Sequence, residues 1–337
     1  MSRWKQAALA ASMAGLAALA APAVRAAGYY DGKTVTMIVP NTPAGAMTQY
    51  ARMLAPYIAK QLGAKDVRVD NQPGAGSLRG TNMLWNAKPD GLTVAFTNLP
   101  TLIMAQLAGS PGVNFDAAKF TYLGSVADDP RVLVVGANSP LKSMQDVQKL
   151  DRPFVYPTQG TDEDFYTMSV LFNTLGKPLK AVTGYQGDPD TSLAVIKGDG
   201  DGHMTSWATT APSLKSKEKR AILHMGEKRY ADEPDVPAVT EIVTDQAKLR
   251  PLKTMIDIMS VSRGFFGPQN MDQQATQEMR AAIGKALADP ELIAESQKRG
   301  LPVHFYSGES EQTRVQRAME GGKDLTPILQ AAAQSIK

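Results

Sequence analysis

The chain has 337 residues, of which 43% are hydrophobic and 20% charged, as in an ordinary soluble globular protein and unlike a disordered or collagen-like chain. The absence of cysteine excludes disulfides, thiol nucleophiles, cysteine-ligated zinc and iron–sulfur clusters. The formal net charge of +3 comes from three basic residues near the N-terminus, so we expect no nucleic-acid partner. At about 150 residues per domain, the length predicts two domains.

The first 26 residues have the pattern of a secretory signal peptide. Arg3 and Lys5 form a basic start, an Ala/Leu-rich run follows, and small residues precede a cleavage site after Ala26 or Ala27. An uncleaved membrane anchor is the alternative, but the run is weakly apolar and only marginally long enough. We expect a signal peptide over residues 1–26, cleaved near Ala26, and a soluble protein exported to the periplasm.

Predicted strands and helices alternate along the rest of the chain. Strands are predicted at 34–39, 67–70, 92–96, 131–135, 154–156 and 221–225, from apolar runs bounded by Gly or Pro. Helices are predicted at 47–62, 78–87, 161–175, 192–197, 273–288, 290–299 and 311–336. This alternation is typical of parallel sheets covered by helices, so the predicted fold class is α/β. It favours two α/β lobes joined by more than one crossing segment.

Two strand–helix connections are rich in small residues. The loop 41–48 brings backbone N–H groups and a helix start together, which would attract a carboxylate, although a plain tight turn is the alternative. The loop 73–80 resembles a dinucleotide fingerprint. It has three residues rather than two before its last glycine and follows the second strand, which weakens that interpretation.

An acidic segment, Thr161 to Asp164, precedes another predicted helix. Thr161 can be the N-cap and Asp164 the acid of a capping box, with the two acids between them facing the positive end of the helix dipole. A site for a cation or metal is the less favoured alternative. The segment 198–203 resembles a calcium loop but lacks the closing acid, so a Gly-rich turn is expected there.

Known catalytic motifs are missing from the sequence. The three histidines are far apart, and there is no nucleophile elbow, zinc-protease helix or Walker A loop. A Ser/Lys or paired-carboxylate site stays open on spacing alone. Trp207 and Phe96 could wall a pocket, although core packing is the commoner role for such side chains. We expect no catalytic residue, no metal and no cofactor.

Several short motifs occur in a fixed order through nearly the whole chain after the predicted signal peptide. They are Ile38-Val39-Pro40 with Pro43 and Gly45, Asp70 to Gly76 beside the pattern E-N-x-P-G-A-G, Ala87 to Gly91 beside A-x-P-D-G, Asp235-Val236-Pro237 with Glu241 beside D-V-P-T-x-x-E, and Phe266-Gly267-Pro268. This ordered set resembles the Bug-type periplasmic solute receptors of tripartite tricarboxylate transporters.

The resemblance implies a two-lobed, periplasmic-binding-protein-like (type II) fold with a ligand cleft between the lobes. Residues 27–130 and 265–337 would form lobe 1, and residues 131–264 lobe 2. The protein would capture a small carboxylate-containing organic solute, close by a hinge motion, and deliver the solute to membrane permease subunits, acting as a monomer. The alternatives are a periplasmic ligand-sensing partner of a signalling protein and, less favoured, a periplasmic hydrolase.

In this family the first loop and the loop matching Tyr156 to Asp164 hold a carboxylated solute. The resemblance and the loops together give the candidate ligand-binding residues Thr42, Pro43, Ala44, Gly45, Ala46, Met47, Thr48, Gly76, Ser77, Asn98, Thr158, Gly160, Thr161, Asp162, Glu163, Asp164, Tyr166 and Trp207.

The chain departs from the family pattern in both loops. Thr48 stands where the family has an Asp, the acids 162–164 replace a Gly/Ser-rich stretch, and Tyr166 replaces a His. A helix start occupied by its own acids is a poor second anion site. We therefore expect a small organic acid or zwitterion, with one carboxylate on lobe 1 and a neutral, hydroxylated or cationic opposite end.

Overall fold

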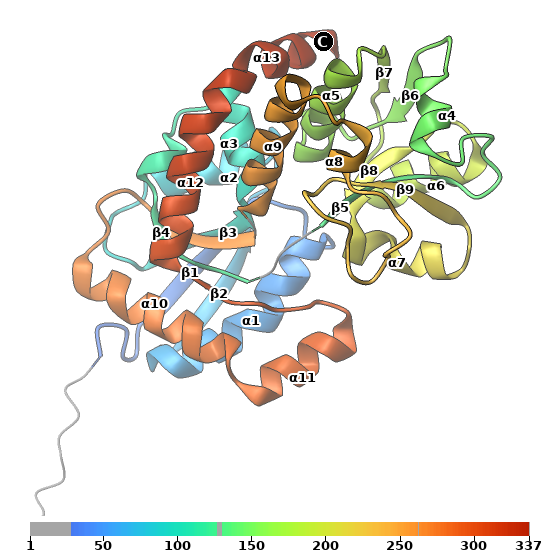
Figure 1. The fold of residues 1–337 in the computed structure, drawn as a ribbon. Helices are drawn as coiled ribbons and strands as arrows, with labels where there is room; N and C mark the ends of the chain where they lie inside the picture. The colour runs from blue at the N-terminus through green and yellow to red at the C-terminus, as the bar shows by residue number, and fades with distance from the viewer. Residues whose placement is uncertain (1–27, 127–129, 262, 337) are drawn as a thin grey trace, which may run out of the picture.

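The computed structural model describes residues 28–126, 130–261 and 263–336, so the predicted signal peptide lies outside the described residues. Two groups of strands separate in space, each with its own helices (Figure 1). The first group is a six-stranded sheet in the order β11-β4-β10-β3-β1-β2. Its strands are β1 (Thr34–Val39), β2 (Asp66–Asn71), β3 (Thr93–Asn98), β4 (Thr121–Ser125), β10 (Arg263–Gly267) and β11 (Tyr306–Ser307).

This sheet is built from both ends of the chain. β1 pairs in parallel with β2 and β3, whereas β10 runs antiparallel between β3 and β4. The chain therefore leaves this lobe after β4 and returns to the middle of the sheet through β10. We refer to this part as lobe 1.

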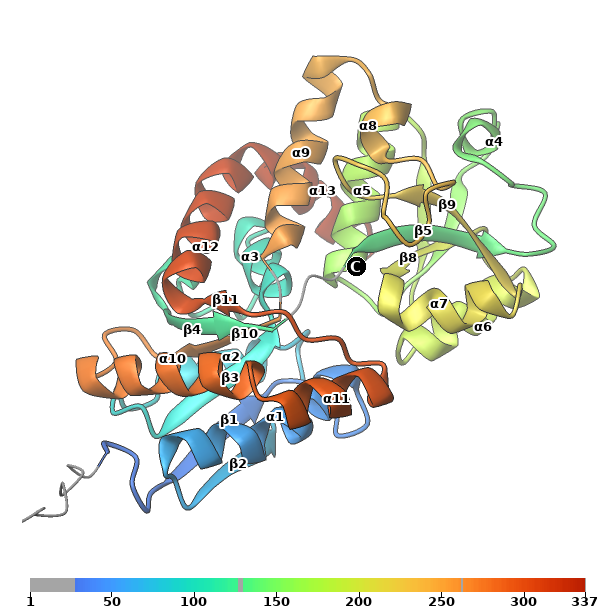
Figure 2. The ribbon, with the colours of Figure 1, turned by 60° about the horizontal axis from the view of Figure 1, so that its bottom comes forward.

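Helices cover both faces of the lobe 1 sheet (Figure 2). One face carries α1 (Ala46–Leu62), α10 (Gln273–Leu287) and α11 (Pro290–Arg299); the other carries α2 (Leu78–Trp85), α3 (Leu99–Leu107) and α12 (Gly308–Gly322), with the short 3-10 turn Ala117–Lys119 beside it. In β1, Val35, Met37 and Val39 are buried in the core under α1, while Ile38 belongs to the core on the opposite face. The alternation follows from the period-2 geometry of a strand.

The second group of strands forms two small sheets, which we call lobe 2. β5 (Arg131–Gly136) lies between β8 (His203–Ser206) and β9 (Lys219–His224), and both pairings are antiparallel. β6 (Phe154–Pro157) and β7 (Leu179–Val182) pair in parallel. The expectation of parallel sheets is therefore wrong for the β8-β5-β9 sheet, because a buried apolar run looks the same whichever way its neighbours run.

Lobe 2 also has helices of its own. They are α4 (Met144–Gln148), α5 (Glu163–Leu175), α6 (Asp188–Lys197), α7 (Trp207–Lys215) and α8 (Val239–Ile242).

Two further helices join the lobes. α9 (Gln246–Ser260) packs on α5 and α12, and α13 (Thr326–Ser335), which follows the 3-10 turn Lys323–Leu325, packs on α3 and α5. Buried leucines of α3, α5, α9 and α13 belong to one continuous hydrophobic core, so apolar packing holds the lobes together on this side.

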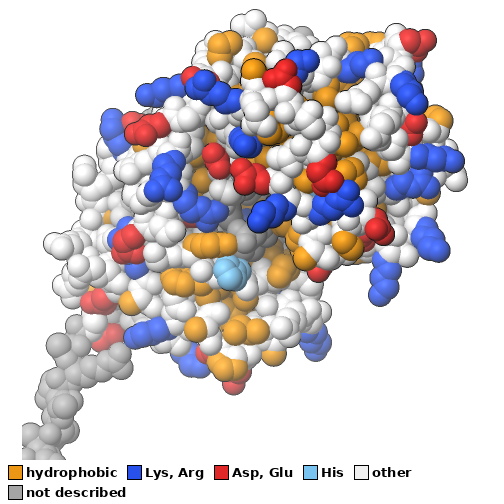
Figure 3. Space-filling view, viewed as in Figure 1, with side chains coloured by type: hydrophobic (Ala, Val, Ile, Leu, Met, Phe, Trp, Pro, Cys, Tyr) orange, Lys and Arg blue, Asp and Glu red, His pale blue; other side chains and the backbone are white. Residues whose placement is uncertain are grey.

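No helix among the described residues is long and apolar enough to cross a membrane. On the face in Figure 3, basic and acidic side chains are interspersed rather than gathered into a patch of one sign.

Candidate ligand-binding site between the lobes

The lobe 1 side of the site is the loop between β1 and α1. Thr42, Pro43, Ala44 and Ala46 are exposed and Gly45 is half-buried. The first N–H groups of α1 have no carbonyl partner within the helix and carry the positive end of its dipole. The Gly45 N–H already donates to the Thr42 carbonyl and the Thr48 N–H to the Gly45 carbonyl, both at 3.0 Å. The anion site predicted here therefore depends on the N–H groups of Ala46 and Met47, at the first turn of α1.

The last two residues of the predicted first loop, Met47 and Thr48, are buried beneath its exposed part. The Thr48 side chain is fully buried, its hydroxyl donates to the Thr42 carbonyl at 2.8 Å, and the Asn71 amide donates to the Thr48 hydroxyl at 2.7 Å. Met47 is buried in the core under the sheet. Thr48 and Met47 are thus placed to position the loop rather than to touch a solute.

The second small-residue loop has a different conformation. Four consecutive residues have positive φ: Gly74 (132°), Ala75 (49°), Gly76 (60°) and Ser77 (74°). Ser77 precedes α2 but its side chain does not cap the helix. Among the described residues, no hydrogen bond joins Gly76 or Ser77 to the other predicted site residues.

On lobe 2, the predicted capping residue is wrong by one position. Asp162, not Thr161, is the N-cap of α5, and its carboxylate accepts a 2.8 Å hydrogen bond from the Phe165 N–H. Asp is at least as good a cap as Thr, so the helix begins one residue later. The preceding turn is closed by Thr158, whose hydroxyl donates to the Gly160 carbonyl at 2.9 Å.

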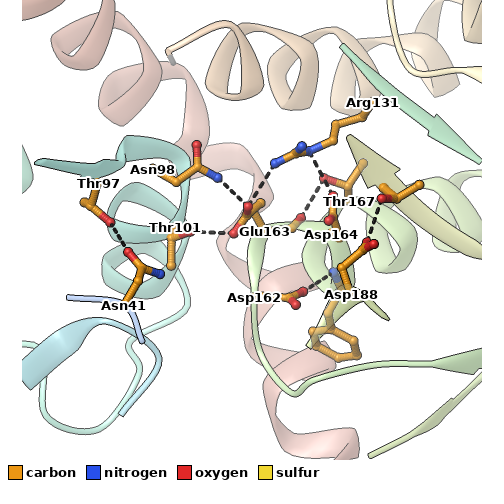
Figure 4. A network of polar contacts seen from close by, with 12 residues as sticks. Asn41, Thr97, Asn98, Thr101, Arg131, Asp162, Glu163, Asp164, Thr167 and Asp188 are labelled. Carbon is orange, nitrogen blue, oxygen red and sulfur yellow. Dashed lines mark hydrogen bonds and ion pairs between the residues drawn. The ribbon is translucent and has the colours of Figure 1, made fainter. Parts of the chain in front are cut away.

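Glu163 connects the two lobes (Figure 4). Its carboxylate accepts a hydrogen bond from the Asn98 amide and another, 2.5 Å long, from the Thr101 hydroxyl. Asn98 is the N-cap of α3, yet its side chain makes no cap hydrogen bond, because the amide points to Glu163 instead. The predicted residues Asn98 and Glu163 therefore come together across the boundary between the lobes.

Arg131 is the site residue that sequence reasoning missed. Its guanidinium lies 2.9 Å from the Glu163 carboxylate and 3.0 Å from that of Asp164, and its side chain is only 5% exposed. In the sequence, Arg131 is recognisable only as the first residue of a predicted strand. The signal in the sequence is a charged residue at the start of an apolar strand. A charged side chain that is buried with such a strand needs a partner of opposite charge.

Carboxyl groups crowd the lobe 2 side of the site. Burial first, and then the neighbouring Glu163 charge, raise the pKa of Asp162 to about 7. Burial also raises the pKa of Asp164 well above its usual value, although Arg131 opposes the shift. Asp188, at the start of α6, adds to both effects and accepts a 2.7 Å hydrogen bond from Thr205. Four carboxyl groups thus lie on this side of the site, and Arg131 contacts two of them, Glu163 and Asp164. A second anion here would raise the pKa values further, whereas a bound cation would favour the charged carboxylates.

The aromatic candidates lie around the network rather than in it. Tyr166 is buried, and its hydroxyl lies 3.4 Å from the Ser110 hydroxyl of lobe 1. Trp207 is half-buried at the start of α7, with its ring 5.2 Å from that of Tyr230. The suggestion that Phe96 walls a pocket is wrong: it is fully buried in the lobe 1 core, 4.5 Å from the ring of Phe265.

Neither the acidic segment nor the Gly-rich turn forms a metal site in the described residues. No group of three or more metal-ligating side chains occurs among them. Asp201 of the Gly-rich turn instead forms a bidentate pair with Arg152 at 2.6 and 2.7 Å, and it accepts from the Val155 N–H. A groove of about 610 Å³ along β9, lined in part by Lys142, Lys219 and Asp235, lies apart from the predicted site residues.

Two lobes with a polar site between them define a solute-binding protein of the periplasmic-binding-protein type. The family model described as the tripartite tricarboxylate transporter family receptor matches residues 50–332. The chain belongs to this family.

Named relatives and solved structures agree with this family. The "UPF0065 protein in gbd 5'region" of Cupriavidus necator is 28% identical over 294 residues, covering 85% of this chain and 84% of that protein. Protein BugT of Bordetella pertussis is 24% identical over 67% of this chain and 70% of its own length. The structure of BugD superposes with a TM-score of 0.71 at 20% identity, covering 89% of this chain and 98% of BugD. MatC from Rhodopseudomonas palustris, solved with bound malate, gives 0.72 at 20% identity, covering 87% and 99%.

The family model confirms the predicted family and its role as a transporter receptor, and the solved structures confirm the two-lobed α/β fold. The family is one of periplasmic binding proteins that act as transporter receptors.

Proposed function

We propose that the chain binds a small organic solute with one carboxylate and a cationic or hydroxylated opposite end. The observation that carries this proposal is the unequal charge of the two sides. The loop Thr42–Ala46 on lobe 1 offers N–H groups, whereas lobe 2 offers Asp162, Asp164 and Asp188 around a single arginine. A solute carboxylate belongs at the first loop, and an ammonium or hydroxyl belongs beside the acids.

The relatives support the carboxylate half of this proposal. MatC was solved with malate and another R. palustris protein of the same fold with adipate. Both ligands have two carboxylates. The acids of lobe 2 in this chain are the reason to expect a different second group.

We also propose that residues 1–26 are removed near Ala26 on export and that the mature protein acts as a monomer. It delivers its solute to the permease subunits of a tripartite tricarboxylate-type transporter. We propose residues 27–130 and 265–337 as lobe 1 and residues 131–264 as lobe 2. The division is supported by the membership of β10 and β11 in the first sheet.

Three probes built on the same three-carbon chain test the ligand class. 4-Aminobutyrate, glutarate and butyrate each have one carboxylate on this chain, and they differ in what its far carbon carries: an ammonium, a second carboxylate or only hydrogen. We expect 4-aminobutyrate to bind at least about tenfold more tightly than glutarate, which is about 1.4 kcal/mol in binding free energy. Calorimetry gives the affinities, and a thermal-shift series gives an independent order.

A pair of variants makes the test specific to the acids. Asp164→Asn should reduce the preference for 4-aminobutyrate, whereas Asp201→Asn, a lobe 2 acid paired with Arg152 outside the site, should not. Tighter binding of glutarate than of 4-aminobutyrate by the unmodified protein would refute the proposal.

A further inference from the structure

The carboxylate of Glu163 lies where several anion-attracting groups converge. The N-terminus of α3 contributes the Asn98 amide and the Thr101 hydroxyl, and β5 contributes the buried guanidinium of Arg131. α3 has nine residues, and Asn98 stands at its N-terminus, so the positive end of its dipole also faces this point. These groups form an anion subsite, and an acid of the chain itself fills it.

Neither local role on lobe 2 requires Glu163. Asp162 already caps α5 through the Phe165 N–H. Asp164 already pairs with Arg131 within lobe 2, at 3.0 Å. The contacts that distinguish Glu163 from its two acidic neighbours are those to lobe 1, with Asn98 and Thr101.

We propose that Glu163 is a specificity-determining residue that acts as an internal carboxylate. It occupies the anion subsite between α3 and α5, excludes a solute carboxylate from that position, and adds polar contacts to the apolar packing that joins the lobes before a solute arrives. The exclusion of a solute carboxylate rests on the proposed function, because it matters only if a solute binds between the lobes. The effect of Glu163 on the separation of the lobes does not depend on a solute.

The expected effect on closure follows from the contacts. Two hydrogen bonds to a carboxylate cross the boundary, and each is worth about a factor of ten or more in an equilibrium. Removing them should lower the ratio of closed to open molecules by a factor on the order of 100. The neighbouring Tyr166–Ser110 contact also crosses the boundary, but it joins two neutral hydroxyls at 3.4 Å and contributes less.

The absence of cysteine allows a direct measurement of lobe separation. Arg79→Cys on α2 and Thr209→Cys on α7, both exposed positions, introduce one spin label in each lobe without a background thiol. Electron–electron distance measurements on the solute-free protein should give one short distance. Adding Glu163→Ala should add a population at a longer distance, and Thr101→Val should do so to a smaller extent from the lobe 1 side.

The matched control is Asp201→Asn, which changes a lobe 2 acid paired with Arg152 outside the site and no contact across the boundary. It should leave the short distance unchanged. Acetate, a free carboxylate small enough for the vacated subsite, should restore the short distance in Glu163→Ala and leave the unmodified protein as it was. Glutarate should bind more tightly to Glu163→Ala than to the unmodified protein.

The proposal that Glu163 closes the lobes would be overturned if Glu163→Ala and Thr101→Val gave the same distances as the unmodified protein, or if Asp201→Asn opened the lobes equally. If acetate did not restore the short distance in Glu163→Ala, the proposal of an anion subsite would be overturned. If Glu163→Ala does not fold, as judged by circular dichroism, Thr101→Val decides. The distances are read without solute, so a failure of every solute to bind would refute the proposed function and leave this result standing.

Discussion

Replacing Asp162 by Asn should stabilise the protein at pH 8 and have little effect near pH 4. Burial and the neighbouring Glu163 charge raise the pKa of Asp162 to about 7, so its charged form is disfavoured in the folded state. Asn ranks with Asp as an N-cap, and its side-chain oxygen can accept the same hydrogen bond from the Phe165 N–H. The substitution therefore removes the charge and keeps the cap.

The sign and size follow from proton linkage. The pKa of Asp162 rises from 3.8 to about 7 on folding, so between pH 4 and 7 the folded state binds more protons than the unfolded state. The stability of the unmodified protein falls as pH rises through this range. A rise of roughly 3 units corresponds to about 4 kcal/mol at pH 8, shrinking to under about 1 kcal/mol near pH 4. Asp162→Asn should regain that amount.

Urea unfolding, followed by tryptophan fluorescence at five pH values from 4 to 8, measures the effect. Asp245→Asn is the matched control, because Asp245 also caps a helix, α9, but at an exposed position. A variant that is less stable than the unmodified protein at pH 8, or a gain of equal size at pH 4 and pH 8, would show that the buried charge of Asp162 is not the cause.

Three other substitutions test separate parts of the structure. Burial lowers the pKa of His203 to about 4, so His203→Gln should remove a loss of stability that the unmodified protein suffers as pH falls from 6.5 to 4, visible in the same urea series. Arg131→Met leaves Glu163 and Asp164 without their cation and should cost about 3–5 kcal/mol in unfolding free energy, measured by urea at pH 7. Phe96→Ala should cost a similar 3–5 kcal/mol through a core cavity while leaving the affinity for bound solute unchanged in calorimetry.

Elements with a clear apolar period could be predicted from the sequence. The strand at 34–39 was predicted with its observed bounds, and the helix at 273–288 to within one residue. α3 was missed because its residues are almost all buried, so the sequence has no polar face and no helical period. α7 and α9 each contain an internal proline, Pro212 and Pro251, which masks a helix in a sequence pattern.

The two loops of the site could be predicted, but their relation could not. The exposed N–H groups of the first loop and the acids 162–164 follow from local patterns of small and acidic residues. The contact between Asn98 and Glu163 joins residues 65 positions apart on different lobes, and no local period encodes such a contact. The charge of Arg131 gains meaning only when packing shows that it is buried beside these acids.

The raised pKa of Asp162 gives the proposed ligand class a signature that affinity alone lacks. At pH 7 the group is about half protonated, because its pKa is about 7. An ammonium bound beside it would stabilise the carboxylate, lower this pKa and release up to about half a proton from Asp162 per solute, whereas butyrate would release none. Calorimetric titration of 4-aminobutyrate at pH 7, in two buffers that differ in ionisation enthalpy, counts the released protons, and Asp162→Asn should remove the share that comes from Asp162 and leave the share from Asp164, whose pKa is also raised. Tight binding of 4-aminobutyrate with the same apparent enthalpy in both buffers would place its ammonium group away from Asp162, and the acids of lobe 2 would then no longer account for the choice of solute.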